Sequence, residues 1–223
     1  MQNVIIKLVL FYPLFLFSLS WHEAAHGWVA DKFGDPTAKM MGRVTLSPLP
    51  HMDIVGTVIL PILGIVTGAA VIGWGKPVPV NPYNLKGEMR KSNLWVAAVG
   101  PASNIVLAIG FAIGAHILMW LLPNIPMRMI VPGSASATAI GVIYAIFQMG
   151  VILNLVLAFF NLIPLPPLDG GAVLRGLIPE RSLDAYDSFS RYSFVILLVL
   201  FVTGLLRYIL IPAFLLAGYL LPA

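Results

Sequence analysis

The sequence contains no cysteine and very few charged side chains. Of its 223 residues, 10% are Asp, Glu, Lys or Arg, whereas 59% are hydrophobic, and the mean hydropathy is +0.94. The absence of cysteine excludes disulfides and thiolate metal sites, which leaves His, Asp and Glu as possible metal ligands. The scarcity of charge excludes a soluble domain of this size, because such a domain needs a more polar surface, and indicates an integral membrane protein.

The basic residues form no continuous patch. The formal net charge is +4, but Lys and Arg are scattered between apolar runs. This pattern is typical of loops that face anionic lipid headgroups, and it gives no footprint for nucleic acid. The length suits a single helical bundle without a large domain outside the membrane.

The apolar runs predict an all-α polytopic membrane protein, a helical bundle of about five to six membrane segments. Residues 39–49 have short strand character, which predicts a small extended or β-like element between the first spans. The prolines of residues 73–82 predict extended backbone, of which residues 76–81 could offer an edge that pairs with an unwound peptide. We expect a single domain over 1–223, with a core of about 10–175 and C-terminal membrane segments of about 192–222. The predicted segments are 4–30, 54–73, 93–122, 137–163, 192–210 and 213–222.

The placement of Lys and Arg predicts the topology. Seven of the thirteen basic residues lie between residues 32 and 91 and three more lie in 175–191, whereas 123–136 has only Arg128. The positive-inside rule therefore places the first two regions in the cytoplasm. Residues 54–73 have basic residues on both sides, so we expect this run to re-enter or to lie along the interface. The first apolar run lacks a cleavage pattern, which predicts a retained helix and not a signal peptide.

One short run places three ionisable side chains inside the first apolar segment. His22 and His26 are four residues apart, so on a helix both imidazoles lie on one face and can reach one metal ion. Glu23 lies beside them, where it could take a proton from a water on that ion. Ionisable groups are costly at membrane depth, so the cluster predicts a functional metal site.

A zinc site in a peptidase needs a third protein ligand and an open position for water. Asp169 is the best candidate, because it follows a proline-broken helix end where the backbone can unwind. The Gly-Gly pair after it also allows another backbone to approach closely. Asp53 suits a cap of the segment that follows it. We expect His116 to pack or to lie at the interface, and His51 to be solvated in a loop.

Several amides and small residues are candidates for supporting roles. Asn154 and Asn161 are seven residues apart and share one helix face. We expect Asn154 to tie helices together, and Asn161 to donate to the oxyanion of a tetrahedral intermediate. The pair Gly100 and Asn104 suits close helix packing against the site. A polar channel for water is predicted to be lined by Ser18, Ser20, Asn104 and Asn161.

Three motifs in register resemble the site-2 protease family of intramembrane zinc metalloproteases. Their order and separation match the three-segment core of that family, and the resemblance covers about residues 10–175. Three motifs together are far more specific than any one of them. The motifs are His22-Glu23-x-x-His26, Gly100-x-x-x-Asn104 and Asn161-x-x-Pro-x-Pro-x-Leu-Asp169-Gly170.

The resemblance implies that His22, His26 and Asp169 bind one Zn²⁺ per chain and that Glu23 is the catalytic acid/base. It also implies that Asn161 helps to position the scissile carbonyl. The expected substrate is a transmembrane protein cut in or near its membrane segment, in regulated intramembrane proteolysis. The expected location is a bacterial or archaeal cell membrane, with the active site toward the cytoplasmic side. The chain looks like a short form of the family, without PDZ or nucleotide-sensing (CBS) domains.

Two other classes of protein account for part of the sequence. A cation transporter or a non-hydrolytic metal-binding membrane protein would use His22, His26 and Asp169 to handle an ion. Such proteins usually have inverted repeats and several broken helices with polar residues at the midplane, whereas the sequence shows one cluster and no repeat. A structural membrane anchor would leave the cluster unexplained.

Overall fold

The computed structural model of the protein describes residues 2–68, 73–124 and 135–222, and all regular secondary structure in these ranges is helical. The three longest helices are α1 (Gln2–Lys32), α4 (Met89–Leu121) and α5 (Ala135–Asn161). The shorter helices are α2 (Thr37–Met40), η1 (Leu49–His51), η2 (Ile54–Ile59), α3 (Leu60–Thr67), η3 (Pro82–Asn84), η4 (Leu122–Asn124), α6 (Asp169–Leu177), η6 (Glu180–Ser182), α7 (Leu183–Ser190), α8 (Ser193–Val202), α9 (Leu206–Ile209) and α10 (Ile211–Leu220).

The five to six predicted membrane segments include two, 54–73 and 213–222, that are not expected to cross the membrane alone. Within the described ranges three helices are long and apolar enough, or four if the bent pair Glu180–Ser190 and Ser193–Val202 counts as one span. The apolar helices Ile54–Thr67 and Leu206–Leu220 are shorter than a span requires. The first of these fits the expectation that 54–73 does not cross once, although residues 69–72 lie outside the described ranges, as does Arg128.

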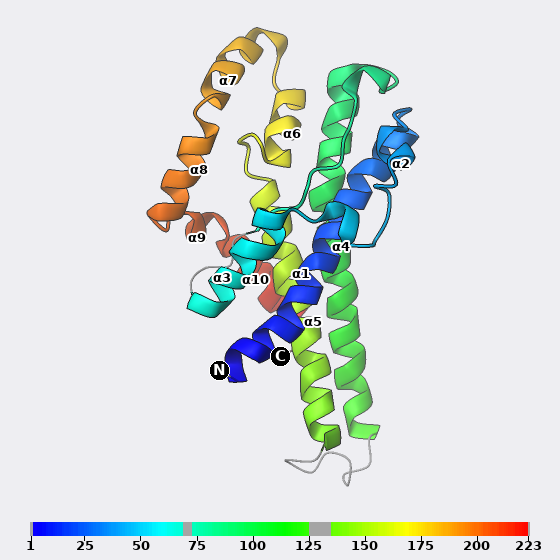
Figure 1. The fold of residues 1–223 in the computed structure, drawn as a ribbon, viewed down its shortest axis with the longest axis vertical. Coiled ribbons are helices and arrows are strands. Elements are labelled where there is room, and N and C mark those ends of the chain that lie inside the picture. The colour runs from blue at the N-terminus through cyan, green and yellow to red at the C-terminus, as the bar shows by residue number, and fades with distance from the viewer. Residues whose placement is uncertain (1, 69–72, 125–134, 223) are drawn as a thin grey trace.

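The core of the bundle is the antiparallel pair α4 and α5, which α1 crosses obliquely (Figure 1). Small residues allow these helices to approach closely: a Cβ on Gly150 of α5 would lie 2.5 Å from the Phe111 ring of α4. Close van der Waals packing of this kind holds membrane helices together, because the hydrophobic effect does not drive helix association inside lipid. The innermost cluster also includes α10 and consists of Ala108, Ala112, Val151, Leu155, Ala213 and Ala217.

The predicted strand over 39–49 was wrong. Residues 37–40 form the short helix α2, and Gly42 ends it with a φ of +67°. The Gly42 N–H donates to the Lys39 carbonyl and the Arg43 N–H donates to the Ala38 carbonyl, which is the Schellman pattern of helix ends. These local bonds occupy the backbone groups that a strand ladder would need.

The predicted continuous segment 192–210 is broken in the structure. Helix α8 ends at Val202, and Gly204 has a φ of +72°, which only glycine adopts at little cost. The chain then resumes as α9 and α10, and Pro212 lies in the first turn of α10, where a proline fits. Glycine at 204 therefore stops the helix before the proline does.

Asp35 connects the end of α1 to residues 81–84 through hydrogen bonds. Its carboxylate is fully buried. It accepts hydrogen bonds from the Thr37 N–H and hydroxyl, from the Asn81 N–H at 2.6 Å and from the Asn84 amide at 3.0 Å. Burial alone disfavours the charged form, but these donors outweigh burial and lower the pKa of Asp35.

Replacing Asp35 with alanine should lower the free energy of unfolding by roughly 1–3 kcal/mol, because buried donors lose their acceptor. Since folding lowers the pKa of Asp35, its contribution is complete above the unfolded value of about 3.9 and is lost as pH falls through the folded value. Thermal unfolding in detergent, followed by tryptophan fluorescence from pH 7 to 3, measures this. The control Asp31→Ala removes a pairing with the exposed Lys39 and should cost less than about 1 kcal/mol. Equal losses in the two variants would contradict the assignment.

Candidate metal centre

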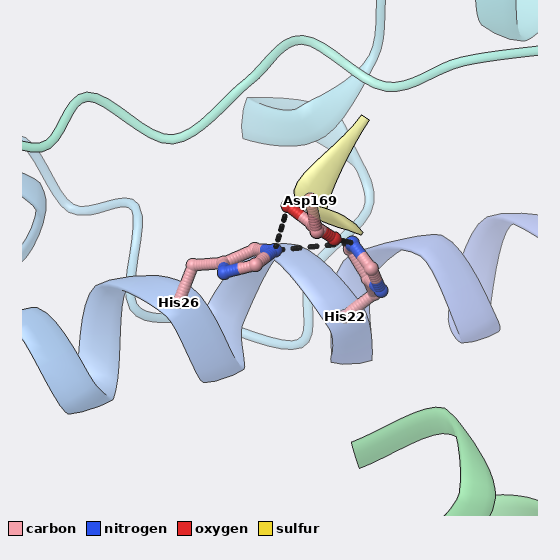
Figure 2. A group of neighbouring side chains, drawn as sticks. All are labelled: His22, His26 and Asp169. Atoms are coloured by element: carbon pink, nitrogen blue, oxygen red, sulfur yellow. Dashed lines mark hydrogen bonds and ion pairs between the residues drawn. The ribbon is translucent and has the colours of Figure 1, made fainter. Parts of the chain in front are cut away.

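His22 and His26 project from one face of α1, and Asp169 reaches them from the first turn of α6 (Figure 2). The two histidines are 5% and 9% exposed. Their ligand atoms and an oxygen of Asp169 all lie within 4.8 Å of one another. The structure thus brings together the three residues that the sequence predicts as ligands.

The separations within this group fit a tetrahedral ion. The two Nε2 atoms are 3.1 Å apart, and the carboxylate oxygens lie 3.1 Å from His22 Nε2 and 3.4 Å from His26 Nε2. Ligand atoms that each lie about 2.1 Å from a tetrahedral zinc are about 3.4 Å from one another. The donor set of two imidazoles and one carboxylate is also one that catalytic zinc sites use.

Each imidazole is oriented by a partner on α4 that forms a hydrogen bond with its Nδ1 atom. His26 Nδ1 lies 2.7 Å from the Val96 carbonyl oxygen, and His22 Nδ1 lies 2.6 Å from Asn104 Oδ1. Both partners are acceptors, so each Nδ1 carries the proton and each Nε2 keeps a lone pair directed at the other ligands. Three acceptors therefore converge, and Asp169 Oδ2 is buried without a hydrogen bond. A cation would satisfy this group.

Asp169 reaches α1 because the chain folds back tightly after α5. A Cβ on Gly170 would overlap the Leu162 carbonyl, and one on Gly171 would lie 2.6 Å from the Pro166 nitrogen. Tyr186 of α7 donates to the Gly171 carbonyl at 2.8 Å. The expected close backbone approach at the Gly-Gly pair is confirmed, and α7 adds a support that no sequence pattern indicated.

Glu23 and Asn161 line the same cavity of about 400 Å³ as the three candidate ligands. Glu23 is 9% exposed, and its Oε2 accepts a hydrogen bond of 2.8 Å from the Val78 N–H. Asn161 donates from Nδ2 to the Leu157 carbonyl at 2.9 Å. Residues 76–80 have no regular secondary structure, and the Val78 N–H is directed at Glu23 and not at an open edge.

The other candidate ligands lie outside this cluster. Asp53 caps η2 by accepting from the N–H groups of Val55 and Gly56, as expected. His116 pairs with the Leu220 carbonyl of α10. The expectation that His51 is solvated was wrong: it is 1% exposed and pairs with the Thr45 carbonyl, and burial lowers its pKa.

The predicted water channel is not formed by the residues proposed for it. Ser18, Ser20 and Asn104 are buried, with exposures of 0%, 1% and 0%, and only Asn161 of the four lines the cavity. Sequence reasoning also missed the Val96 carbonyl and the Val78 N–H. These are backbone groups that any residue supplies, so no residue type could have marked them.

Comparisons with known proteins agree with the motifs. The model of peptidase family M50 matches residues 10–203. "Putative zinc metalloprotease YwhC" of Bacillus subtilis is 39% identical over 213 residues, which are 91% of this chain and 89% of that protein. "Putative zinc metalloprotease Rip2" of Mycolicibacterium smegmatis is 27% identical over 86% of this chain and 66% of its own length. No solved structure matches the chain. The chain therefore belongs to peptidase family M50, the site-2 protease family of zinc metalloproteases.

Proposed function

We propose that this protein is an intramembrane zinc metalloprotease that hydrolyses peptide bonds in or near the transmembrane segments of other membrane proteins. In this proposal His22, His26 and Asp169 hold one zinc ion per chain. The observation that carries it is the convergence of three lone-pair donors within 4.8 Å in a buried site. Acceptors gathered in this way repel one another unless a cation lies between them.

A zinc ion held there would supply Lewis acidity and would bring the pKa of an attacking water toward neutrality. Glu23 would take the proton of that water and return it to the leaving nitrogen, and it lies in the same cavity as the ligands. The Val78 N–H would hold the Glu23 carboxylate in one orientation for this role. Asn161 would hold the scissile carbonyl by donating an amide hydrogen.

The surroundings of the site support a substrate that is itself a membrane segment. The cluster lies on α1 and against α4, two of the three helices that are long and apolar enough to span a bilayer. A substrate helix would have to unwind before cleavage, because helical carbonyls are occupied by their own hydrogen-bond ladder. The cavity of about 400 Å³ has room for a short extended stretch of peptide.

The proposed location is the cell membrane of a bacterium, since the relatives named above are bacterial proteins. The basic residues on the loops near the site favour the cytoplasmic side for the active centre.

We further propose that residues 1–223 act as one domain, because the candidate ligands come from α1 and α6 and are oriented from α4.

Chelation tests this function. The purified protein should cut a single-span test protein in detergent, lose that activity with 1,10-phenanthroline and regain it with added zinc, because the metal is required for cleavage. Asp169→Ala should lose bound zinc, which mass spectrometry measures. Asp53→Ala should keep it, because Asp53 only caps η2. If liposomes that contain the protein took up a divalent cation and no cleavage occurred, the result would instead favour a transporter.

A further inference from the structure

The two histidines of the candidate metal centre are oriented by different kinds of partner. His26 Nδ1 faces a backbone carbonyl, that of Val96. A carbonyl can only accept, so it fixes the His26 tautomer by itself. His22 Nδ1 faces the side-chain amide of Asn104. An amide can present either an acceptor or a donor, so a further contact must decide which end of Asn104 faces His22.

The shorter of two such contacts is with Asn154 on α5, since the other, from Asn104 Nδ2 to the Ser18 carbonyl, is 3.5 Å long. Asn104 Nδ2 donates to Asn154 Oδ1 at 2.9 Å. Asn154 Nδ2 in turn donates to the Gly150 carbonyl at 2.8 Å and to Ser18 Oγ at 3.0 Å. Both amides and Ser18 are fully buried, so water does not compete for these hydrogen bonds.

The direction of this chain of hydrogen bonds is set at its far end. The Gly150 carbonyl accepts only, so Asn154 must turn its NH₂ group toward it and its oxygen toward Asn104. Asn104 must then present its own NH₂ group to Asn154, which turns Asn104 Oδ1 toward His22. His22 Nδ1 must therefore carry the proton, which leaves a lone pair on Nε2 for a metal.

We infer that Asn154 is a positioning residue for the metal centre: through Asn104 it selects the tautomer of His22 that can bind zinc. This inference rests on the proposed zinc site. It gives Asn154 a task beyond the helix tie expected from the sequence, because a tie between α4 and α5 would hold whichever way both amides pointed. The selection, in contrast, requires the observed order of donors and acceptors.

Asn154→Leu removes the oxygen that holds the Asn104 amide. Leucine is close to asparagine in size, so the change adds little volume. Asn104 Nδ2 then keeps only the 3.5 Å contact with the Ser18 carbonyl. A contact of that length is weak, so Asn104 can turn its NH₂ group toward His22 Nδ1, which favours the tautomer with the proton on Nε2. We expect zinc affinity, measured by competition with a chromogenic chelator, to fall about 10–100-fold, the usual effect of losing an outer partner of a metal ligand. Asn104→Leu should lose affinity to a similar extent.

The matched control is Leu155→Ala, one residue further along α5. Leu155 is fully buried in the core cluster with Val151 and Ala108, so its truncation leaves a cavity and weakens the same contact between α4 and α5. It should leave zinc affinity within about twofold of the unaltered protein, because it removes no link of the chain. A loss of affinity in Leu155→Ala equal to that in Asn154→Leu would show that Asn154 acts only through packing.

Two further measurements make the test specific. In the Asn104→Leu background, Asn154→Leu should weaken zinc binding no further, since both changes break one pathway; additive losses would overturn the inference. The chain has four histidines, so ¹⁵N-histidine spectra of the zinc-free protein should show His22 changing tautomer in Asn154→Leu. An unchanged tautomer would also overturn it. If the unaltered protein bound no zinc, the proposed function would fail, and the spectra would still test the tautomer.

Discussion

Replacing Glu23 with glutamine is expected to lower the rate of peptide-bond cleavage by about 10²–10⁴-fold, the share that a general acid or base supplies. Glutamine has nearly the same shape and can still accept from the Val78 N–H, but it cannot take up the proton. Zinc content should stay at one ion per chain, because Glu23 is not in the group of converging ligand atoms. Single-turnover cleavage and metal analysis on the same preparation measure the two effects.

The matched control for this change is Glu88→Gln at the start of α4. Glu88 forms an exposed ion pair with Lys91, so its replacement should leave cleavage within about twofold and zinc content unaltered. Cleavage by Glu23→Gln at the rate of the unaltered protein would remove Glu23 from the mechanism. Loss of zinc from Glu23→Gln would instead assign Glu23 to the metal centre itself.

A methyl group at Gly100 is expected to abolish the metal centre. A Cβ at this position on α4 would overlap His26 Nε2 and lie 2.6 Å from His22 Cε1. Neither ring can retreat freely, because each Nδ1 is held by a hydrogen bond to α4. We expect Gly100→Ala to bind zinc at least about 100-fold more weakly, since displaced ligands no longer match the geometry that zinc requires. Cleavage should fall to background.

Gly110→Ala is the control on the same helix, because an added Cβ there meets no atom within 4 Å. It should keep zinc binding and cleavage, and it should stabilise α4 by up to about 1 kcal/mol through helix propensity. Circular dichroism and thermal unfolding would show that both variants fold. Normal zinc affinity in Gly100→Ala would contradict the close contact between α4 and the histidines.

The sequence predicted the long helices and the grouping of ligands because both follow from local patterns. Long apolar runs identified α1, α4 and α5 to within a few residues at each end. Helical spacing placed His22 and His26 on one face, and the proline-rich turn with its Gly-Gly pair identified Asp169.

The failures arose where the backbone or a distant partner decides the structure. At Gly42 the backbone N–H and C=O groups pair within a helix end, which the strand-forming residues around it do not indicate. Gly204 ends a helix that hydropathy predicts to continue. His51 looked like a solvated loop residue because nothing nearby in the sequence shows that it is covered. The partners of Glu23 and His26 are a backbone N–H and a backbone carbonyl, for which a sequence has no signature.

The candidate ligands lie far apart along the chain, two on α1 and one at the start of α6. A ribosome that has released α1 into the bilayer has therefore made only part of the centre, and the third ligand is added after α4 and α5 have been synthesised. Until then the growing polypeptide has no complete set of candidate ligands. The order of the helices thus delays completion of the candidate centre until α6 has been synthesised.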